Sequence, residues 1–101
     1  MKISFSTLGC PDFSWSEIYS MAKDLGFDGI EIRGLGSDIF AVSAQPFKPE
    51  NRANTVKKLR ELGLEIPCLS SGSSLRYVEK KEETLSETRQ YIALAKEIGT
   101  P

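Results

Sequence analysis

Three glycines at nearly equal spacing constrain the fold of this 101-residue chain more than any other feature. Gly26, Gly63 and Gly99 stand 37 and 36 positions apart, and each follows a segment with helical spacing of apolar residues. The clearest stripes occupy positions i, i+3, i+4 and i+7: Ile18, Met21, Ala22 and Leu25 in one segment, and Tyr91, Leu94, Ala95 and Ile98 in another. Glycine is favoured where a helix ends in the left-handed conformation. The spacing therefore predicts a repeated supersecondary unit.

The starts of the predicted helices carry their own signals. Ser14 and Glu17 have the spacing of a capping box, so the first helix is expected to begin directly after Ser14. Pro49 suits the first position of the second helix. The third helix is expected to begin within residues 79–84, where the charged run favours a solvated first turn over a binding site.

Three short strands are predicted between these helices, over residues 2–6, 29–33 and 65–70. The order is strand then helix, three times, and right-handed crossovers make such units a parallel sheet. In the second strand Ile30 and Ile32 alternate with Glu31 and Arg33, which favours a barrel wall over a doubly wound sheet buried on both faces. The predicted fold class is α/β, a (βα)3 portion of a (β/α)8 TIM barrel with helices on the outer face.

The length predicts a single partial domain over residues 1–101, because a closed barrel of this kind takes roughly 250 residues. The chain is expected to stop before strand four, at the carboxyl end of its third unit. Long connections follow the strands, at about residues 7–13, 34–48 and 71–79, while those that follow the helices are short. Working loops in α/β proteins lie at the carboxyl ends of strands, so the candidate site is expected there.

Composition narrows the function classes. A net charge of −1 provides no broad field for nucleic acid or an anionic membrane, and neither partner is expected. No apolar run is long enough for a signal peptide or a membrane span. The chain has no histidine, and its two cysteines make no disulfide framework. A cytoplasmic protein with reduced thiols is the expected class.

Three stretches carry a resemblance to a known family: residues 1–7, residues 25–33 with the run Gly-Phe-Asp-Gly-Ile-Glu-Ile-Arg, and residues 95–101. Together they resemble the first three units of the xylose-isomerase-like barrels, which include sugar phosphate isomerases and epimerases. The resemblance implies a sugar or sugar phosphate ligand in the full barrel. It also implies a divalent metal held by Glu, Asp and His residues from later strands, so no metal ligand and no catalytic residue is predicted within these 101 residues. The related endonucleases have a histidine after strand three, where this chain reads Ser70-Ser71-Gly72-Ser73, and this disfavours DNA repair.

Glu31 and Arg33 are the leading candidates for substrate binding. Their alternation with isoleucines places them on the inner face of the second strand, where a carboxylate and a guanidinium suit sugar hydroxyls or a phosphate. The alternatives are a structural ion pair in the barrel wall, or an Arg33 exposed in the loop.

Three further positions are weaker candidates. Ser70 opens the loop Ser70–Ser74, whose backbone amides suit an anion, although a solvated loop is the favoured interpretation. Arg76 is within reach of the mouth, but a surface position is the default. Cys10 precedes Pro11 in the first connection and is a candidate substrate contact, but no histidine is available to activate it as a nucleophile.

Two functions follow from these observations. The first is the N-terminal fragment of a metal-dependent sugar phosphate isomerase or epimerase, inactive on its own. The second is a stand-alone α/β module that binds a small ligand or assembles with itself. Self-association is expected because the first and third strands would both be open edges.

Overall fold

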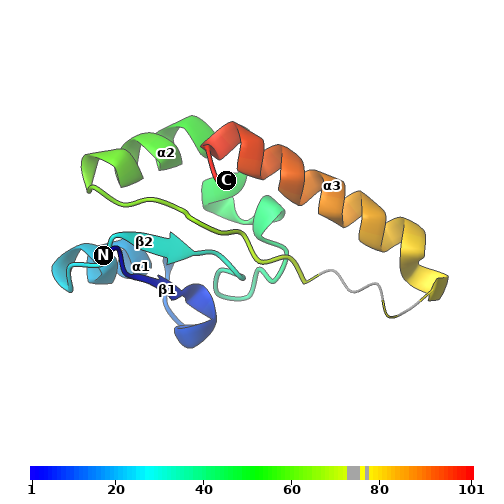
Figure 1. The fold of residues 1–101 in the computed structure, drawn as a ribbon, viewed down its shortest axis with the longest axis horizontal. Helices are drawn as coiled ribbons and strands as arrows, with labels where there is room; N and C mark the ends of the chain where they lie inside the picture. The colour runs from blue at the N-terminus through cyan, green and yellow to red at the C-terminus, as the bar shows by residue number, and fades with distance from the viewer. Residues whose placement is uncertain (73–75, 77) are drawn as a thin grey trace.

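The computed structural model describes residues 1–72, 76 and 78–101. Its main elements are β1 (Ser4–Ser6), α1 (Trp15–Asp24), β2 (Gly29–Glu31), α2 (Arg52–Glu61) and α3 (Lys81–Ile98), with 3-10 turns η1 (Thr7–Gly9), η2 (Ala41–Ser43), η3 (Gln45–Phe47) and η4 (Val78–Lys80). Figure 1 shows the carboxyl end of α3 meeting the amino end of α2, with the extended segment 65–70 running between α2 and β2. None of the helices within this described part has the length and hydropathy that a membrane crossing requires.

β1 and β2 form a parallel pair, as predicted, although both strands are shorter than the sequence indicated. Ser4 lies opposite Gly29, and Ser6 lies opposite Glu31. Segment 65–70 continues the sheet on the other side of β2 through two parallel bridges, Gly29 to Glu65 and Ile32 to Leu69. β2 is therefore central, and Ile30 and Ile32 are fully buried in the core beneath the helices. The predicted α/β class with parallel strands is confirmed.

A bulge interrupts the predicted third strand. The Ile30 N–H donates to the Glu65 carbonyl at 2.9 Å, and the Ile32 N–H donates to the Cys68 carbonyl at 3.1 Å. Two residues of β2 are thus matched by three residues of the segment, which defines a β-bulge. Pro67 lies inside it and has no N–H for the ladder, so the segment forms isolated bridges instead of a continuous strand. Beyond the bulge each side chain occupies the face opposite to the one that simple alternation from Glu65 would give.

The three helix ends share one geometry. Gly26, Gly63 and Gly99 have φ values of 75°, 72° and 78°, as their spacing predicted. In each case the residue after the glycine donates its N–H to a carbonyl five residues earlier, at 2.8 to 2.9 Å: Phe27 to Ala22, Leu64 to Leu59, and Thr100 to Ala95. This hydrogen bond satisfies a carbonyl of the last turn and directs the chain back toward the sheet.

The predicted capping box at the start of α1 is confirmed. The Ser14 hydroxyl accepts from the Glu17 N–H at 3.2 Å, and the Glu17 carboxylate accepts from the Ser14 N–H at 3.0 Å. α3 also begins inside the predicted range, at Lys81, directly after η4.

The predicted start of the second helix is wrong. α2 begins at Arg52, and Pro49 lies in the turn before it. The Lys48 carbonyl accepts from the N–H groups of both Asn51, at 2.8 Å, and Arg52, at 3.1 Å. The Asn51 amide also donates to the Gln45 carbonyl at 2.7 Å. These contacts close a turn in which Asn51 precedes the helix, so the signal at Pro49 marks the turn and not the first helical residue.

The predicted loop 34–48 is folded against the core. It contains η2 and η3, and Ala41, Ala44 and Phe47 are all fully buried. The Phe47 ring packs edge-on against Trp15, with ring centroids 5.7 Å apart. The Tyr91 hydroxyl of α3 accepts from the Ala41 N–H at 3.1 Å. The connection is therefore part of the apolar interior that supports the sheet.

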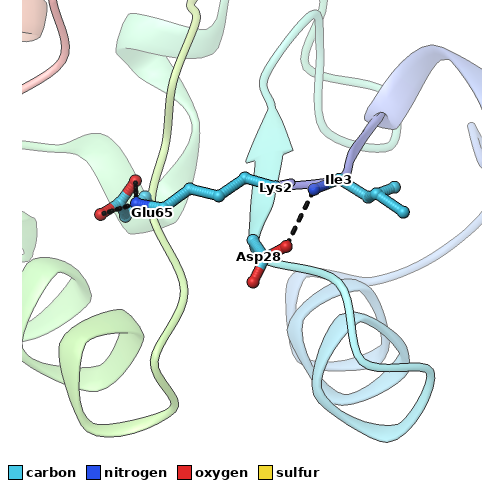
Figure 2. Close-up of polar contacts among 4 residues, drawn as sticks. All are labelled: Lys2, Ile3, Asp28 and Glu65. Atoms are coloured by element: carbon cyan, nitrogen blue, oxygen red, sulfur yellow. Dashed lines mark hydrogen bonds and ion pairs between the residues drawn. The ribbon is translucent and has the colours of Figure 1, made fainter.

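The amino-terminal ends of the strands are joined by close polar contacts, which Figure 2 shows. Asp28 and Ile3 exchange two hydrogen bonds at 2.8 Å, one through the Asp28 carboxylate and one between backbones. The Asp28 carbonyl also accepts from the Glu65 N–H at 3.0 Å. Lys2 forms an ion pair with Glu65 at 3.3 Å. These contacts hold the amino ends of β1, β2 and segment 65–70 in register.

Candidate functional site

The carboxyl ends of the strands bring several polar side chains together. Glu31, the last residue of β2, accepts a hydrogen bond from the Ser70 hydroxyl at 2.7 Å. Ser70 lies on the same face of the sheet as Glu31 because the bulge at Pro67 shifts the alternation of side chains by one residue. Leu69 lies on the other face. Both residues are partly buried. Within the described part of the chain, the second oxygen of the Glu31 carboxylate accepts no hydrogen bond, so it retains capacity for a ligand.

Arg33 is held by the same segment. Its guanidinium donates through Nη1 to the Ser71 carbonyl. Gly72 lies beside this side chain, and a Cβ at that position would be in ordinary van der Waals contact with Nη1, at 3.7 Å. Glu31 and Arg33 are both described, and no ion pair joins them, so the alternative of a wall ion pair is not what the structure shows. The guanidinium has five N–H donors, and the contact with Ser71 occupies only part of them.

Thr7 connects β1 to this group and was not among the predicted site residues. Only 2% of it is exposed. Its hydroxyl oxygen accepts from the backbone N–H of Arg33 at 2.9 Å and from that of Gly34 at 3.3 Å. The sequence offered one signal for it, a hydroxyl residue directly after β1, but not its partners 26 and 27 positions away. We call Thr7, Glu31, Arg33, Ser70 and Ser71 the carboxyl-end cluster.

Cys10 lies in different surroundings. It lines an apolar hollow of about 620 Å³, whose walls include Phe5, Leu8, Phe13, Leu25 and Phe27 but neither Glu31 nor Arg33. Burial raises the pKa of the Cys10 thiol above its ordinary value of 9.0. The thiol therefore stays protonated near neutral pH, which does not suit a nucleophile.

The remaining predicted residues, Ser70 and Arg76, lie in different surroundings. The Ser70 amide donates to the Ile32 carbonyl at 2.8 Å, so it belongs to the sheet and is not available to an anion. Arg76 is exposed in a turn between segment 65–70 and α3. Ser73 and Ser74, the rest of the predicted anion loop, lie outside the described residues.

The carboxyl-end cluster does not have the donor set of a metal centre. It contains one carboxylate, and nowhere in residues 1–72, 76 and 78–101 do three Asp, Glu or Cys side chains gather closely enough to hold an ion. The chemistry that these residues themselves can provide is recognition: an acceptor oxygen on Glu31 and a planar cation on Arg33.

A solved structure has a similar fold. The crystal structure of the probable 3-DHS dehydratase AsbF from Bacillus anthracis, a protein involved in petrobactin synthesis, matches with a TM-score of 0.76 and 25% sequence identity. The match covers 99% of this chain and 36% of that chain, so this chain spans about a third of that protein's length. No family model and no curated protein matches the sequence. The chain thus has the α/β fold of a portion of a TIM barrel.

Proposed function

We propose that this chain forms the first three βα units of a xylose-isomerase-like barrel enzyme and supplies part of its substrate-binding wall. The substrate class is a sugar phosphate or a related polyol that carries an anionic group and a carbonyl. Removal of a proton beside the carbonyl is an available first step for isomerisation, epimerisation and dehydration of such compounds. The fold match to a protein named as a dehydratase and the resemblance to isomerases both support this class.

The arrangement of Glu31 and Arg33 carries the proposal. Both side chains end at the carboxyl side of β2, and both are held by segment 65–70, through Ser70 and Ser71 respectively. Each keeps unused hydrogen-bonding capacity. The free oxygen of Glu31 would accept from a substrate hydroxyl, and the guanidinium of Arg33 would donate to a phosphate or carboxylate. Two fixed contacts of opposite charge would orient the substrate in one direction across the strand.

The reacting groups are expected outside these residues. In the proposed enzyme a divalent metal would polarise the substrate carbonyl, and its ligands would come from later strands. Glu31 and Arg33 are assigned to binding and orientation only. We therefore expect no turnover from the 101-residue chain alone.

The test is a screen for isomerase, epimerase and dehydratase activity on sugar phosphates and polyol acids, with added Mg²⁺, Mn²⁺ or Zn²⁺. The 101-residue chain and any longer product of its gene are assayed in parallel. The expected result is activity in the longer product only. Arg33→Gln in that product should raise KM for an anionic substrate by about 10- to 100-fold with little change in kcat, because it removes one charge-assisted contact. Turnover by the 101-residue chain, or an unchanged KM, would contradict the proposal.

A second candidate is a module that assembles with itself. In the part of the chain that the structure describes, β1 pairs on one side only, with β2, and this favours self-assembly. Leu8 and Leu25, which line the apolar hollow beside β1, are 69% and 68% exposed, and Ile3 is 53% exposed. An open strand edge with apolar flanks pairs readily with a second copy of the same chain. Light scattering over a range of concentrations should then show dimers or larger species, which Leu25→Lys disperses. A well-folded monomer at high concentration would exclude this function.

A further inference from the structure

Thr7 replaces a strand partner at the point where the β1–β2 pairing ends. The last paired residues are Ser6 and Glu31. One step beyond, the Thr7 hydroxyl takes the place of a backbone carbonyl and accepts both the Arg33 N–H, at 2.9 Å, and the Gly34 N–H, at 3.3 Å. A hydroxyl oxygen has two lone pairs, so this side chain uses all of its acceptor capacity on the backbone of two residues.

The residues on either side of Arg33 have little freedom. On one side, the Ile32 carbonyl accepts from the Ser70 N–H at 2.8 Å, and the Ile32 N–H donates to Cys68. On the other side, a Cβ at Gly34 would lie 3.3 Å from the Asp38 carbonyl oxygen, so the chain passes close to its own later backbone there. Thr7 supplies the contact that fixes the Arg33 amide itself between these two points.

We infer that Thr7 is a positioning residue for Arg33, which sets the direction from which the guanidinium meets its ligand. The inference rests on the proposed function, in which Arg33 binds the anionic group of the substrate. Thr7 does not touch the ligand in this scheme. Without its hydroxyl, the Arg33 backbone would rotate away from β1, and the guanidinium would leave the Ser71 carbonyl.

The test compares Thr7→Val, which keeps the shape and removes the acceptor, with Thr7→Ser, which keeps the acceptor. Three readouts are taken by NMR on the 101-residue chain: hydrogen exchange of the Arg33 and Gly34 amides, the Arg33 Nε–Hε signal, and a titration with inorganic phosphate. Thr7→Val should speed exchange of the two amides at least 10-fold, shift the Nε–Hε signal and weaken phosphate binding about 10-fold. Thr7→Ser should restore all three.

Thr55→Val is the matched structural control. Thr55 is also buried, and its hydroxyl donates to the Pro46 carbonyl at 2.6 Å, away from the carboxyl-end cluster. This variant should lower stability without moving the Arg33 signal. If Thr7→Val does not fold, Thr7→Cys takes its place, since a thiol of similar size is a weaker acceptor.

An Arg33 signal that is the same in the wild type and in Thr7→Val or Thr7→Cys would overturn the inference, whatever the phosphate result. Failure of the proposed function is distinguishable. In that case Arg33→Gln would leave phosphate binding unaltered, while the Thr7 variants would still displace the Arg33 side chain.

Discussion

The two ends of the same three extended segments use their polar groups differently. At the amino end, the Asp28 carboxylate and backbone are committed to Ile3 and Glu65, and the contacts close on each other. At the carboxyl end, Glu31 and Arg33 are each held by one contact and retain further capacity. At the amino end the polar groups thus bind one another within the chain. At the carboxyl end the polar side chains are held in place but keep further hydrogen-bonding capacity. This is the division expected between the structural and the functional rim of a barrel.

Gly29→Ala should have the largest effect on stability, because it adds a side chain at the closely packed amino end of the strands. A Cβ there would lie 2.7 Å from the Ser4 hydroxyl oxygen and 3.0 Å from both the Glu65 carbonyl oxygen and the Pro67 ring. The backbone and the ring cannot yield, so we expect a loss of about 2–3 kcal/mol in urea unfolding. Gly9→Ala is the control, since a Cβ at Gly9 would meet nothing within 4 Å. Equal losses in the two variants would show that the amino end is not tightly packed.

Asp28→Ala should have an intermediate effect. It leaves the Ile3 N–H without its acceptor, which costs about 1 kcal/mol. Lys2→Ala is the comparison at the same end: its ion pair with Glu65 is 73% and 66% exposed, and such pairs contribute about 0–1 kcal/mol. Chemical denaturation of both variants gives the ranking. A larger loss from Lys2→Ala would reverse our view of which contact joins the strands.

Glu31→Gln should change stability by less than about 0.5 kcal/mol, because glutamine still accepts from the Ser70 hydroxyl. In any longer product of the gene, Glu31→Gln should nevertheless weaken binding of a polyol ligand, because the charged acceptor is lost. Glu65→Gln, at the opposite end, controls for removal of one negative charge. If Glu31→Gln were as destabilising as Asp28→Ala, the carboxyl end would be structural and the comparison would fail.

The smallest effect concerns Glu17, the one acidic side chain of the capping box that begins α1. Hydrogen bonds from the Ser14 backbone and, secondly, from its side chain lower the pKa of Glu17 from its ordinary value of 4.5. A lowered pKa in the folded state means that the contribution is complete above pH 4.5 and disappears as pH falls through the folded value. Melting temperatures between pH 7 and pH 2 should show a shallower acid loss in Glu17→Gln than in the wild type. Identical slopes would mean that this carboxylate adds nothing to the fold.

Local signals explain what the sequence could predict. Gly26, Gly63 and Gly99 end helices because the left-handed residue and its hydrogen bonds involve neighbours within one turn. Ser14 and Glu17 form a box for the same reason. The alternation with Ile30 and Ile32 also predicts that Glu31 lies on the face opposite these two buried isoleucines, because strand periodicity needs no knowledge of partners.

Two of the misses depend on partners distant in the sequence. The bulge at Pro67 exists only relative to β2, although the missing N–H of proline argues against a continuous strand. The misplaced helix start at Pro49 has a local cause instead, because a proline at that position fits the turn that closes on Lys48 as well as it fits a first helical turn. The role of Thr7 does not follow from local sequence, because its hydroxyl accepts from two backbone N–H groups that lie far along the chain. The role of Arg33 and Glu31 in binding stays a prediction that only a ligand can test.

The bulge in segment 65–70 decides which side chains of that segment lie beside Glu31. Its one added residue reverses the alternation, so that Leu69 lies opposite Ile32 and Ser70 lies on the face of Glu31. Deleting one residue between Glu65 and Cys68 would remove the bulge but keep both of these positions, and Ser70 would still donate to Glu31. A substitution that keeps the length but straightens the segment would instead turn Ser70 toward the apolar core and leave Glu31 without this donor, while the hydrogen bond between Glu65 and Asp28 stays in place. The carboxyl end thus tolerates the loss of one residue here better than the loss of the extra step in the ladder.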